Sequence, residues 1–300
     1  MFKALFLLII NISFTAQSAV QPVLPELANK FHNVRDFTVF KNEAYISVQN
    51  TLGNVSVIVR LKKSEKGEWT DDKIVSFSGQ YHDMEPFLSA DGYTLYFVSN
   101  RPTDENDASK DFDIWKVERK THDSPWSAAI NMGAVINTDK NEFYPSVANN
   151  GNLYFTANYD DSKGKDDIYV SEYKQGKYQK PHSLSTAINS SGDEYNAYIA
   201  PNEMYLIFGA YKRKDSLGSG DLYRSIRDKD GTWSQATNLG KKINSPYMDY
   251  CPFIDVKNNR LYFTSKRVKK QQQQYQSIDD MLKDFNGYDN GMSRIYKSSI

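Results

Sequence analysis

An internal repeat is the feature that most constrains what this chain can fold into. A segment that begins with an acidic residue and runs on to an apolar pair ending in Phe occurs four times. Its acidic starts are spaced by 57, 52 and 55 residues, at Glu85, Glu142, Glu194 and Asp249. Repeats of about this length are typical of architectures in which similar units pack side by side.

Two further landmarks keep step with the first. An Asp that precedes an apolar and an aromatic residue follows three of the segments, at Asp113, Asp167 and Asp221. Aromatic residues recur in the same phase at Trp69, Trp126, Tyr178 and Trp233. Three landmarks in one phase define a structural unit, and we expect the three aspartates to cap turns at strand starts.

Each unit contains four short runs with strand character, separated by turn residues such as Asp91-Gly92. The 14% aromatic content also favours strands. Four strands per repeat predict a propeller blade, and a divergent first unit from Asp36 to Trp69 makes five. The sequence therefore predicts an all-β fold, a single five-bladed propeller. The blades are expected at about 33–80, 81–137, 138–189, 190–244 and 245–300 plus 19–25.

The last unit contains only three expected strands before Ile300. We expect the segment Val20–Leu24 to add as the outermost strand of that blade and so to close the ring. Pro22 fits this place because an outer strand tolerates a missing N–H donor. The region 269–290 is predicted to be an insertion that carries a short helix at Ile278–Phe285.

The first 18 residues have the pattern of a signal peptide. Lys3 precedes the apolar run Ala4–Ile12, and Ala16 and Ser18 are small residues suited to cleavage after Ser18. We therefore expect a periplasmic or secreted protein whose propeller domain is 19–300, with no membrane span after cleavage. The 37 basic and 37 acidic side chains cancel, which argues against a nucleic-acid partner, and we expect a monomer.

The repeat resembles a known family. The segments Glu85–Gly92, Leu95–Arg101 and Asp113–Trp115 are similar to the WD40-like propeller repeats of TolB-type periplasmic proteins and of exported bacterial proteins joined to OmpA-like domains. The resemblance implies a propeller fold. It implies no single activity, since such propellers serve as binding platforms, sensors, gates of peptidases and, in some relatives, lyases.

Acidic residues at one repeat position are the first candidate site. Placed just before each innermost strand, they are predicted to ring one mouth of the axial channel, where they would hold Ca²⁺ or attract a basic peptide. The competing interpretation is architectural, with each carboxylate accepting backbone N–H bonds from the neighbouring blade. The residues are Asp36, Glu85, Glu142, Glu194 and Asp249.

Basic residues at the start of the loops between second and third strands are the second candidate. Arg101 and Arg267 are examples, and together these loops are expected to form a face that recognises an acidic or carbohydrate partner. The competing interpretation is an ordinary solvated loop surface.

The sequence shows no catalytic centre. His32, His82, His122 and His182 are too scattered to share a metal-ligand spacing. The single cysteine, Cys251, excludes an intramolecular disulfide and is expected to be a buried packing residue. His82 beside Glu85 is the one pairing with acid–base potential. We assign no catalytic residue and no metal ligand.

Three functions remain open at this stage. The first is a non-enzymatic scaffold that binds an envelope or extracellular protein or polysaccharide. The alternative is a carbohydrate-active enzyme, a glycoside hydrolase or lyase with acidic residues near the axis. The third is a sensor of a small ligand. A glycosidase needs a pair of carboxyl groups about 5–10 Å apart at an open pocket, whereas a scaffold would tie its carboxylates into backbone bonds.

Overall fold

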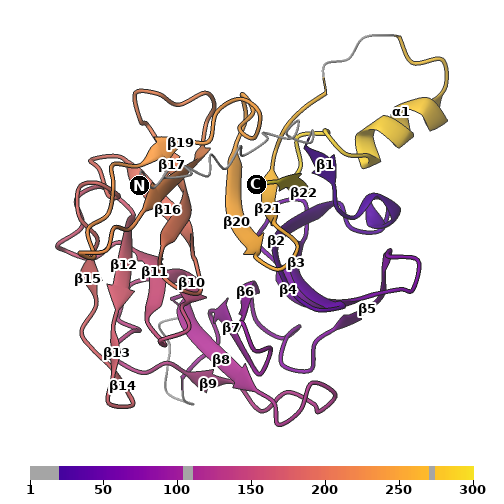
Figure 1. Cartoon of the computed structure of the whole chain (residues 1–300). Coiled ribbons are helices and arrows are strands. Elements are labelled where there is room, and N and C mark those ends of the chain that lie inside the picture. The colour runs from indigo at the N-terminus through magenta and orange to yellow at the C-terminus, as the bar shows by residue number, and fades with distance from the viewer. Residues whose placement is uncertain (1–19, 104–110, 270–273) are drawn as a thin grey trace, which may run out of the picture.

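Five small antiparallel sheets stand around a common axis in the computed structural model, which describes residues 20–103, 111–269 and 274–300 (Figure 1). The fold is the predicted all-β propeller of five blades. The predicted signal peptide, 1–18, lies outside the described residues.

Each blade has four strands, and its innermost strand faces the axis (Figure 1). Blade 1 comprises β2 (Asn33–Phe40), β3 (Glu43–Gln49), β4 (Ser56–Lys63) and β5 (Trp69–Ile74). Blade 2 comprises β6 (Asp83–Leu88), β7 (Thr94–Ser99), β8 (Asp113–Glu118) and β9 (Ile130–Asn131). Blade 3 comprises β10 (Glu142–Val147), β11 (Leu153–Ala157), β12 (Asp167–Ser171) and β15 (His182–Ser183), with a hairpin of β13 (Tyr173–Lys174) and β14 (Lys177–Tyr178) before β15.

The last two blades complete the circle. Blade 4 comprises β16 (Asp193–Ile199), β17 (Tyr205–Tyr211), β18 (Asp221–Ile226) and β19 (Thr237–Asn238). Blade 5 comprises β20 (Asp249–Asp255), β21 (Arg260–Ser265), β22 (Arg294–Ser299) and β1 (Gln21–Pro22). Strand β1 pairs with β22, Gln21 opposite Lys297, and the Val23 N–H donates to the Ile295 carbonyl at 3.0 Å. An N-terminal strand therefore closes the ring, as predicted.

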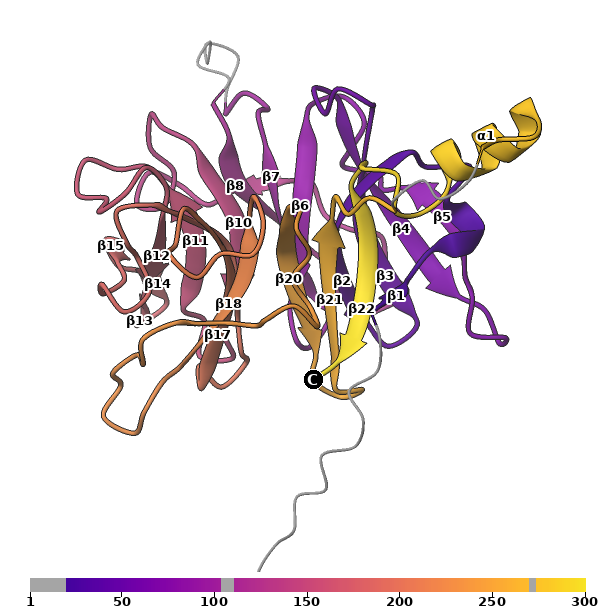
Figure 2. The same ribbon diagram turned by 90° about the horizontal axis from the view of Figure 1, so that it is seen from above.

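The insertion in blade 5 carries helix α1 (Ile278–Asn286), which projects from the ring (Figure 2). Ser277 caps it, because its hydroxyl accepts the Asp280 N–H at 3.1 Å. The helix occupies the predicted place and ends one residue later. Within the described part of the chain, no helix has the length and apolar character needed to cross a membrane. A short 3₁₀ turn, η1 (Pro25–Leu27), follows β1.

A bulge interrupts every innermost strand and places one residue in the left-handed region. Non-glycine residues rarely adopt a positive φ, so its recurrence in all five blades marks a designed bend in the strand. The φ angles are 58° at Asp36, 57° at Glu85, 51° at Tyr144, 52° at Asn196 and 50° at Cys251. These five residues therefore occupy one structural position.

This position corrects the predicted alignment of the acidic residues. Glu142, Glu194 and Asp249 lie two residues before the bulge, and their counterpart in blade 2 is Asp83, not Glu85. The spacing from acid to proline indicates the correct alignment, since Asp83, Glu142 and Asp249 each precede a proline by three residues. The repeated carboxylates and the bulge residues thus form two separate sets.

The predicted ring of five carboxylates around one channel mouth is wrong, because Glu142, Glu194 and Asp249 lie before the bulges and bind loops of the blades. Aromatic side chains also fill part of the axis. Phe87 of blade 2 reaches Phe253 of blade 5, with ring centroids 6.3 Å apart, and Tyr198 packs on Phe253 at 5.4 Å. Because blades 2 and 5 are not neighbours, this contact crosses the axis. We call the end of the axis where the innermost strands begin the mouth end; the aromatic plug lies beyond the bulges, at the far end.

Candidate functional site

The repeated carboxylates lie within the blades and bind the loop that precedes each innermost strand. Glu194 accepts the Ser190 N–H and hydroxyl, both at 2.7 Å. Asp249 accepts the same two groups of Ser245 at 2.5 and 2.7 Å. Glu142 accepts the Thr138 N–H at 3.2 Å and its hydroxyl at 2.8 Å. Each carboxylate is fully buried and holds a loop in place.

Arginines complete this arrangement in three blades. Arg101 contacts Asp83 at 2.7 Å, Arg213 contacts Glu194 at 2.9 Å and Arg267 contacts Asp249 at 2.9 Å. The same guanidinium nitrogens donate to backbone carbonyls of the preceding loops, at Phe77, Ile188 and Ile243. The guanidinium groups of Arg213 and Arg267 each lie over two aromatic rings of their own blade, and that of Arg101 lies over three.

These contacts give a structural role to five of the six predicted ligand-binding residues. Ligand binding by them stays an untested prediction. They are Glu142, Glu194, Asp249, Arg101 and Arg267.

Blade 3 has a tyrosine where blades 2, 4 and 5 have an arginine. The Tyr159 hydroxyl lies 2.7 Å from Oε1 of Glu142 and 3.0 Å from the Ile136 carbonyl oxygen. Burial raises the pKa of Glu142 to about 7, against the opposing effect of hydrogen bonds from Tyr159 and Thr138. This exception is visible in the loop sequences, where Tyr159 stands at the position of Arg101 and Arg267.

The sixth residue, Glu85, belongs to a buried polar cluster on the axis. Arg35 on β2 donates through Nε to Asp36 at 3.1 Å and through Nη2 to Glu85 at 2.5 Å. The backbone orients both carboxyl groups, because Asp36 accepts the Glu85 N–H at 3.2 Å and Glu85 accepts the Tyr144 N–H at 2.7 Å. Two carboxyl groups from adjacent blades therefore flank one guanidinium, a pairing that linear spacing did not reveal.

The other bulge residues complete the cluster. The Asn196 amide lies 3.5 Å from Glu85, and the Tyr144 hydroxyl crosses the axis to donate to the Pro252 carbonyl at 3.0 Å. The Cys251 sulfur lies 3.3 Å from Nη2 of Arg35, and burial raises the pKa of the thiol well above its usual value. Cys251 is thus the buried packing residue that the sequence predicted, not a thiolate nucleophile.

Burial dominates the electrostatics of Glu85. Burial raises the pKa of Glu85 to about 7; Arg35 opposes this shift, and the charge of Asp36 adds to it. Only 3% of the Glu85 side chain is exposed. A carboxyl group with a pKa near 7 is suited to general acid or base catalysis at neutral pH.

A cavity of about 310 Å³ opens at the mouth end between blades 5 and 1. Arg35 and Tyr250 line it, so it reaches the guanidinium that holds Asp36 and Glu85. No sequence pattern marks this cavity, because its lining comes from β2, the 51–53 loop, the start of β20 and the 291–293 segment. We call the axial cluster and this cavity the axial site.

His82 does not bond with Glu85 in the described structure. Its ring packs edge-on against Phe112 at 5.2 Å, and its backbone N–H donates to Asn100 at 2.9 Å. Burial and the charge of Arg35 lower the pKa of His82. The imidazole is therefore neutral at pH 7 and is no direct partner of the axial pair.

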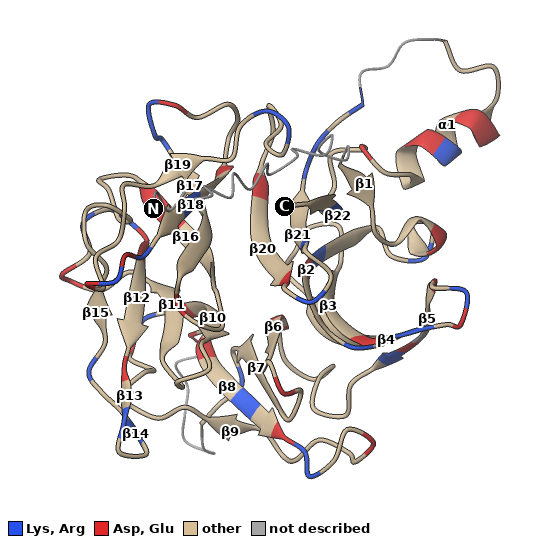
Figure 3. Cartoon of the chain, in the orientation of Figure 1, with Lys and Arg blue, Asp and Glu red and all other residues tan. Residues whose placement is uncertain are grey.

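Acidic and basic segments are interspersed around the ring (Figure 3). Among the described residues, no group of three or more His, Cys, Asp or Glu side chains is placed to hold a metal ion. Calcium binding at the mouth stays a prediction.

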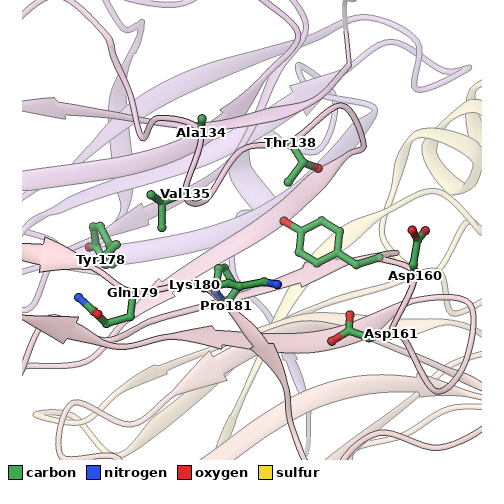
Figure 4. Close-up of a pocket in the computed structure, with 10 residues that line it drawn as sticks. Ala134, Val135, Thr138, Asp160, Asp161, Tyr178, Gln179, Lys180 and Pro181 are labelled. Carbon is green, nitrogen blue, oxygen red and sulfur yellow. The ribbon is translucent and has the colours of Figure 1, made fainter.

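A second cavity of about 680 Å³ lies at the periphery, between blades 2 and 3 (Figure 4). Asp160 and Asp161 line one side of it and Tyr178 the other, and Tyr159 also lines it. It contains no residue of the axial cluster.

Comparisons with known proteins identify the fold. No protein-family model matches the chain, and no curated protein matches its sequence. A solved structure described as "Glycoside hydrolase" aligns with a TM-score of 0.58 and 8% identity over 96% of this chain and 92% of that one. The endo-arabinase from Bacteroides thetaiotaomicron VPI-5482 aligns with a TM-score of 0.56 and 14% identity over 94% and 97%. The alpha-L-arabinofuranosidase from Lactobacillus brevis aligns with a TM-score of 0.52 and 13% identity over 90% and 93%.

At such low identities these similarities establish the fold alone. They nevertheless overturn the main functional prediction, because the propellers that this chain resembles over nearly its full length include glycoside hydrolases. The non-enzymatic scaffold is therefore corrected, and the comparison favours the carbohydrate-active alternative.

Proposed function

We propose that this chain is a carbohydrate-active enzyme that cleaves glycosidic bonds at the axial site. One observation carries the proposal: Asp36 and Glu85, from adjacent innermost strands, share one guanidinium beside a cavity at the mouth end. Glycoside hydrolysis uses two carboxyl groups that reach one pocket. Asp36 and Glu85 do not line the cavity themselves and are reached from it through Arg35, so the proposal requires that substrate displace this side chain.

The two carboxyl groups differ in a way that fits this chemistry. Glu85, with a pKa of about 7, keeps its proton in about half of the molecules at neutral pH and is the proposed general acid that protonates the leaving oxygen. Asp36, bound to Nε of Arg35, is the proposed carboxylate that activates water or stabilises the developing positive charge on the sugar. In the ligand-free protein Arg35 donates a hydrogen bond to Glu85. Substrate therefore has to displace the guanidinium before Glu85 can protonate the leaving oxygen.

The test is release of reducing ends from a panel of plant and bacterial oligosaccharides. Glu85→Gln and Asp36→Asn are each expected to lower kcat by about a thousandfold, as for loss of a general acid or base. The rate is expected to fall as pH rises above about 7, since Glu85 then loses its proton.

Asp160→Asn is the matched control, because Asp160 is 98% exposed and belongs to the peripheral cavity. It is expected to keep full activity. Folded Glu85→Gln protein with wild-type turnover would reject the axial pair as the catalytic groups.

Two finer statements belong to the same proposal. Membership of the TolB-type WD40-like family rests on the repeat signature, and export to the periplasm or exterior rests on the first 18 residues. N-terminal sequencing of the protein recovered from each cell fraction tests export. A mature start at Ala19 or Val20 is the expected result.

A further inference from the structure

We infer that the cavity of the axial site selects a sugar that carries a carboxylate, a uronic acid, over its neutral counterpart. This inference rests on the proposed function and names the substrate class of that site. It follows from the chemistry of the cavity wall.

The wall is cationic and amide-rich. Of the described residues that line the cavity, Arg35 and Lys266 carry positive charge and none is Asp or Glu. Lys266 is exposed. Asn33 and Gln49 add two side-chain amides. A wall that offers donors without carboxylates favours an anion over a cation.

Arg35 has donor capacity left for a ligand. Its Nε and Nη2 contact Asp36, Glu85 and Cys251, while Nη1 bonds to none of the described residues. The side chain is 16% exposed and lines the cavity. Because Asp36 and Glu85 hold the other nitrogens, Nη1 is the nitrogen that remains for a ligand in the cavity.

The two cationic side chains of the wall suit one carboxylate. Arg35 and Lys266 line the same cavity, and no Asp or Glu among the described residues lines it with them. A single sugar carboxylate can therefore accept from Nη1 of Arg35 and from the Lys266 ammonium. The same carboxylate would compete with Glu85 for the guanidinium, which links substrate binding to release of the general acid.

The remaining wall suits a sugar ring. Tyr250 is held by a 2.7 Å hydrogen bond between its hydroxyl and that of Ser293, and it lies with Met248 and Met292 on the cavity wall. Apolar side chains of this kind pack on the C–H face of a sugar, while the amides bond its hydroxyls. A volume of about 310 Å³ is at the lower limit for ligand pockets, which fits one or two sugar units.

The experiment compares two probes that differ only in this group, methyl galactosiduronic acid and methyl galactoside with the same anomeric configuration, by titration calorimetry at low salt. The acidic probe is expected to bind at least tenfold more tightly, and its advantage is expected to shrink as salt is added. Lys266→Met is expected to weaken the acidic probe about fivefold, as for loss of one partly exposed ion pair, and to leave the neutral probe unchanged.

Lys257→Met is the control, because Lys257 is an exposed lysine of the same blade at the opposite end of the hairpin. It is expected to bind both probes like the wild type. Equal affinity for the two probes, or no binding of either, overturns the inference.

The inference and the proposed function fail separately. Glu85-dependent cleavage of neutral glycans without preference for the acidic probe would remove the inference and keep the enzyme. Tight, Lys266-dependent binding of the acidic probe by a protein that cleaves nothing would keep the binding site and remove the hydrolase.

Discussion

Blade 3 differs from blades 2, 4 and 5 at one interaction. In those three blades an arginine both pairs with the buried carboxylate and donates to a loop carbonyl. In blade 3 Tyr159 lies between the same two acceptors, Glu142 and the Ile136 carbonyl. A guanidinium has five protons to donate, whereas a phenol has one.

This count of protons bears on how readily Glu142 takes up a proton. The single phenol proton is shared between Glu142 and the Ile136 carbonyl, so Glu142 receives less compensation for a negative charge than the carboxylates that face an arginine. The charge of Asp113 opposes ionisation further. The comparison teaches that the same fold position holds an arginine-paired carboxylate in three blades and, in blade 3, a carboxyl group whose pKa burial raises to about 7.

Removing an arginine from this position should have the largest effect. Arg213→Ala leaves Glu194 buried without its cation, so the free energy of unfolding is expected to fall by about 3–5 kcal/mol in urea denaturation at pH 7. Tyr159→Phe removes only one hydrogen bond and should cost about 1 kcal/mol. Similar losses in both variants would erase the distinction between the blades.

The ring of blades could be predicted from the sequence and the axial cluster could not, for a physical reason. Blades are local units, so their strands and turns follow from runs such as Leu95–Ser99 and from the phase of the repeat. The axial cluster joins residues far apart in the chain. Arg35, Glu85 and Cys251 meet only because five bulges turn toward one axis.

The alignment error shows where a sharper prediction was possible. Placing Glu85 with Glu142 matched two acidic residues but displaced the prolines Pro86 and Pro145 from each other. Aligning the prolines pairs Glu142 with Asp83 and separates Glu85 from the repeated acids. The contrast between Arg101 and Tyr159 was also present in the loops, but its effect on the charge of Glu142 depends on burial, which the sequence does not show.

The second prediction concerns the pH dependence of the free energy of unfolding that Glu142 causes. The folded-state pKa of Glu142 is about 7 and its ordinary value is 4.5, so the folded protein binds more protons between these values. The stabilisation that comes from the proton on Glu142 is therefore complete below pH 4.5 and is lost as pH rises through 7. Glu142 alone should remove about 2–3 kcal/mol of stability between about pH 5 and 8.

Glu142→Gln tests this assignment, because glutamine copies the neutral acid at every pH. Denaturation curves at several pH values should show a flatter pH profile than the wild type has. Glu85, also near 7, is expected to supply the pH dependence that remains. An unchanged profile would mean that Glu142 is ionised throughout.

The third and smallest effect comes from giving blade 3 the residue of its neighbours. In Tyr159→Arg the guanidinium can pair with Glu142 and donate to Ile136, so the pKa of Glu142 should fall toward its ordinary value. At about pH 8 the variant is expected to be about 1 kcal/mol more stable than the wild type, and at about pH 5 no more stable. Its pH profile should match that of Glu142→Gln, although one variant makes the acid permanently charged and the other permanently neutral. Agreement of two opposite substitutions would locate the proton at Glu142, whereas a Tyr159→Arg protein with the full wild-type pH dependence would place it elsewhere.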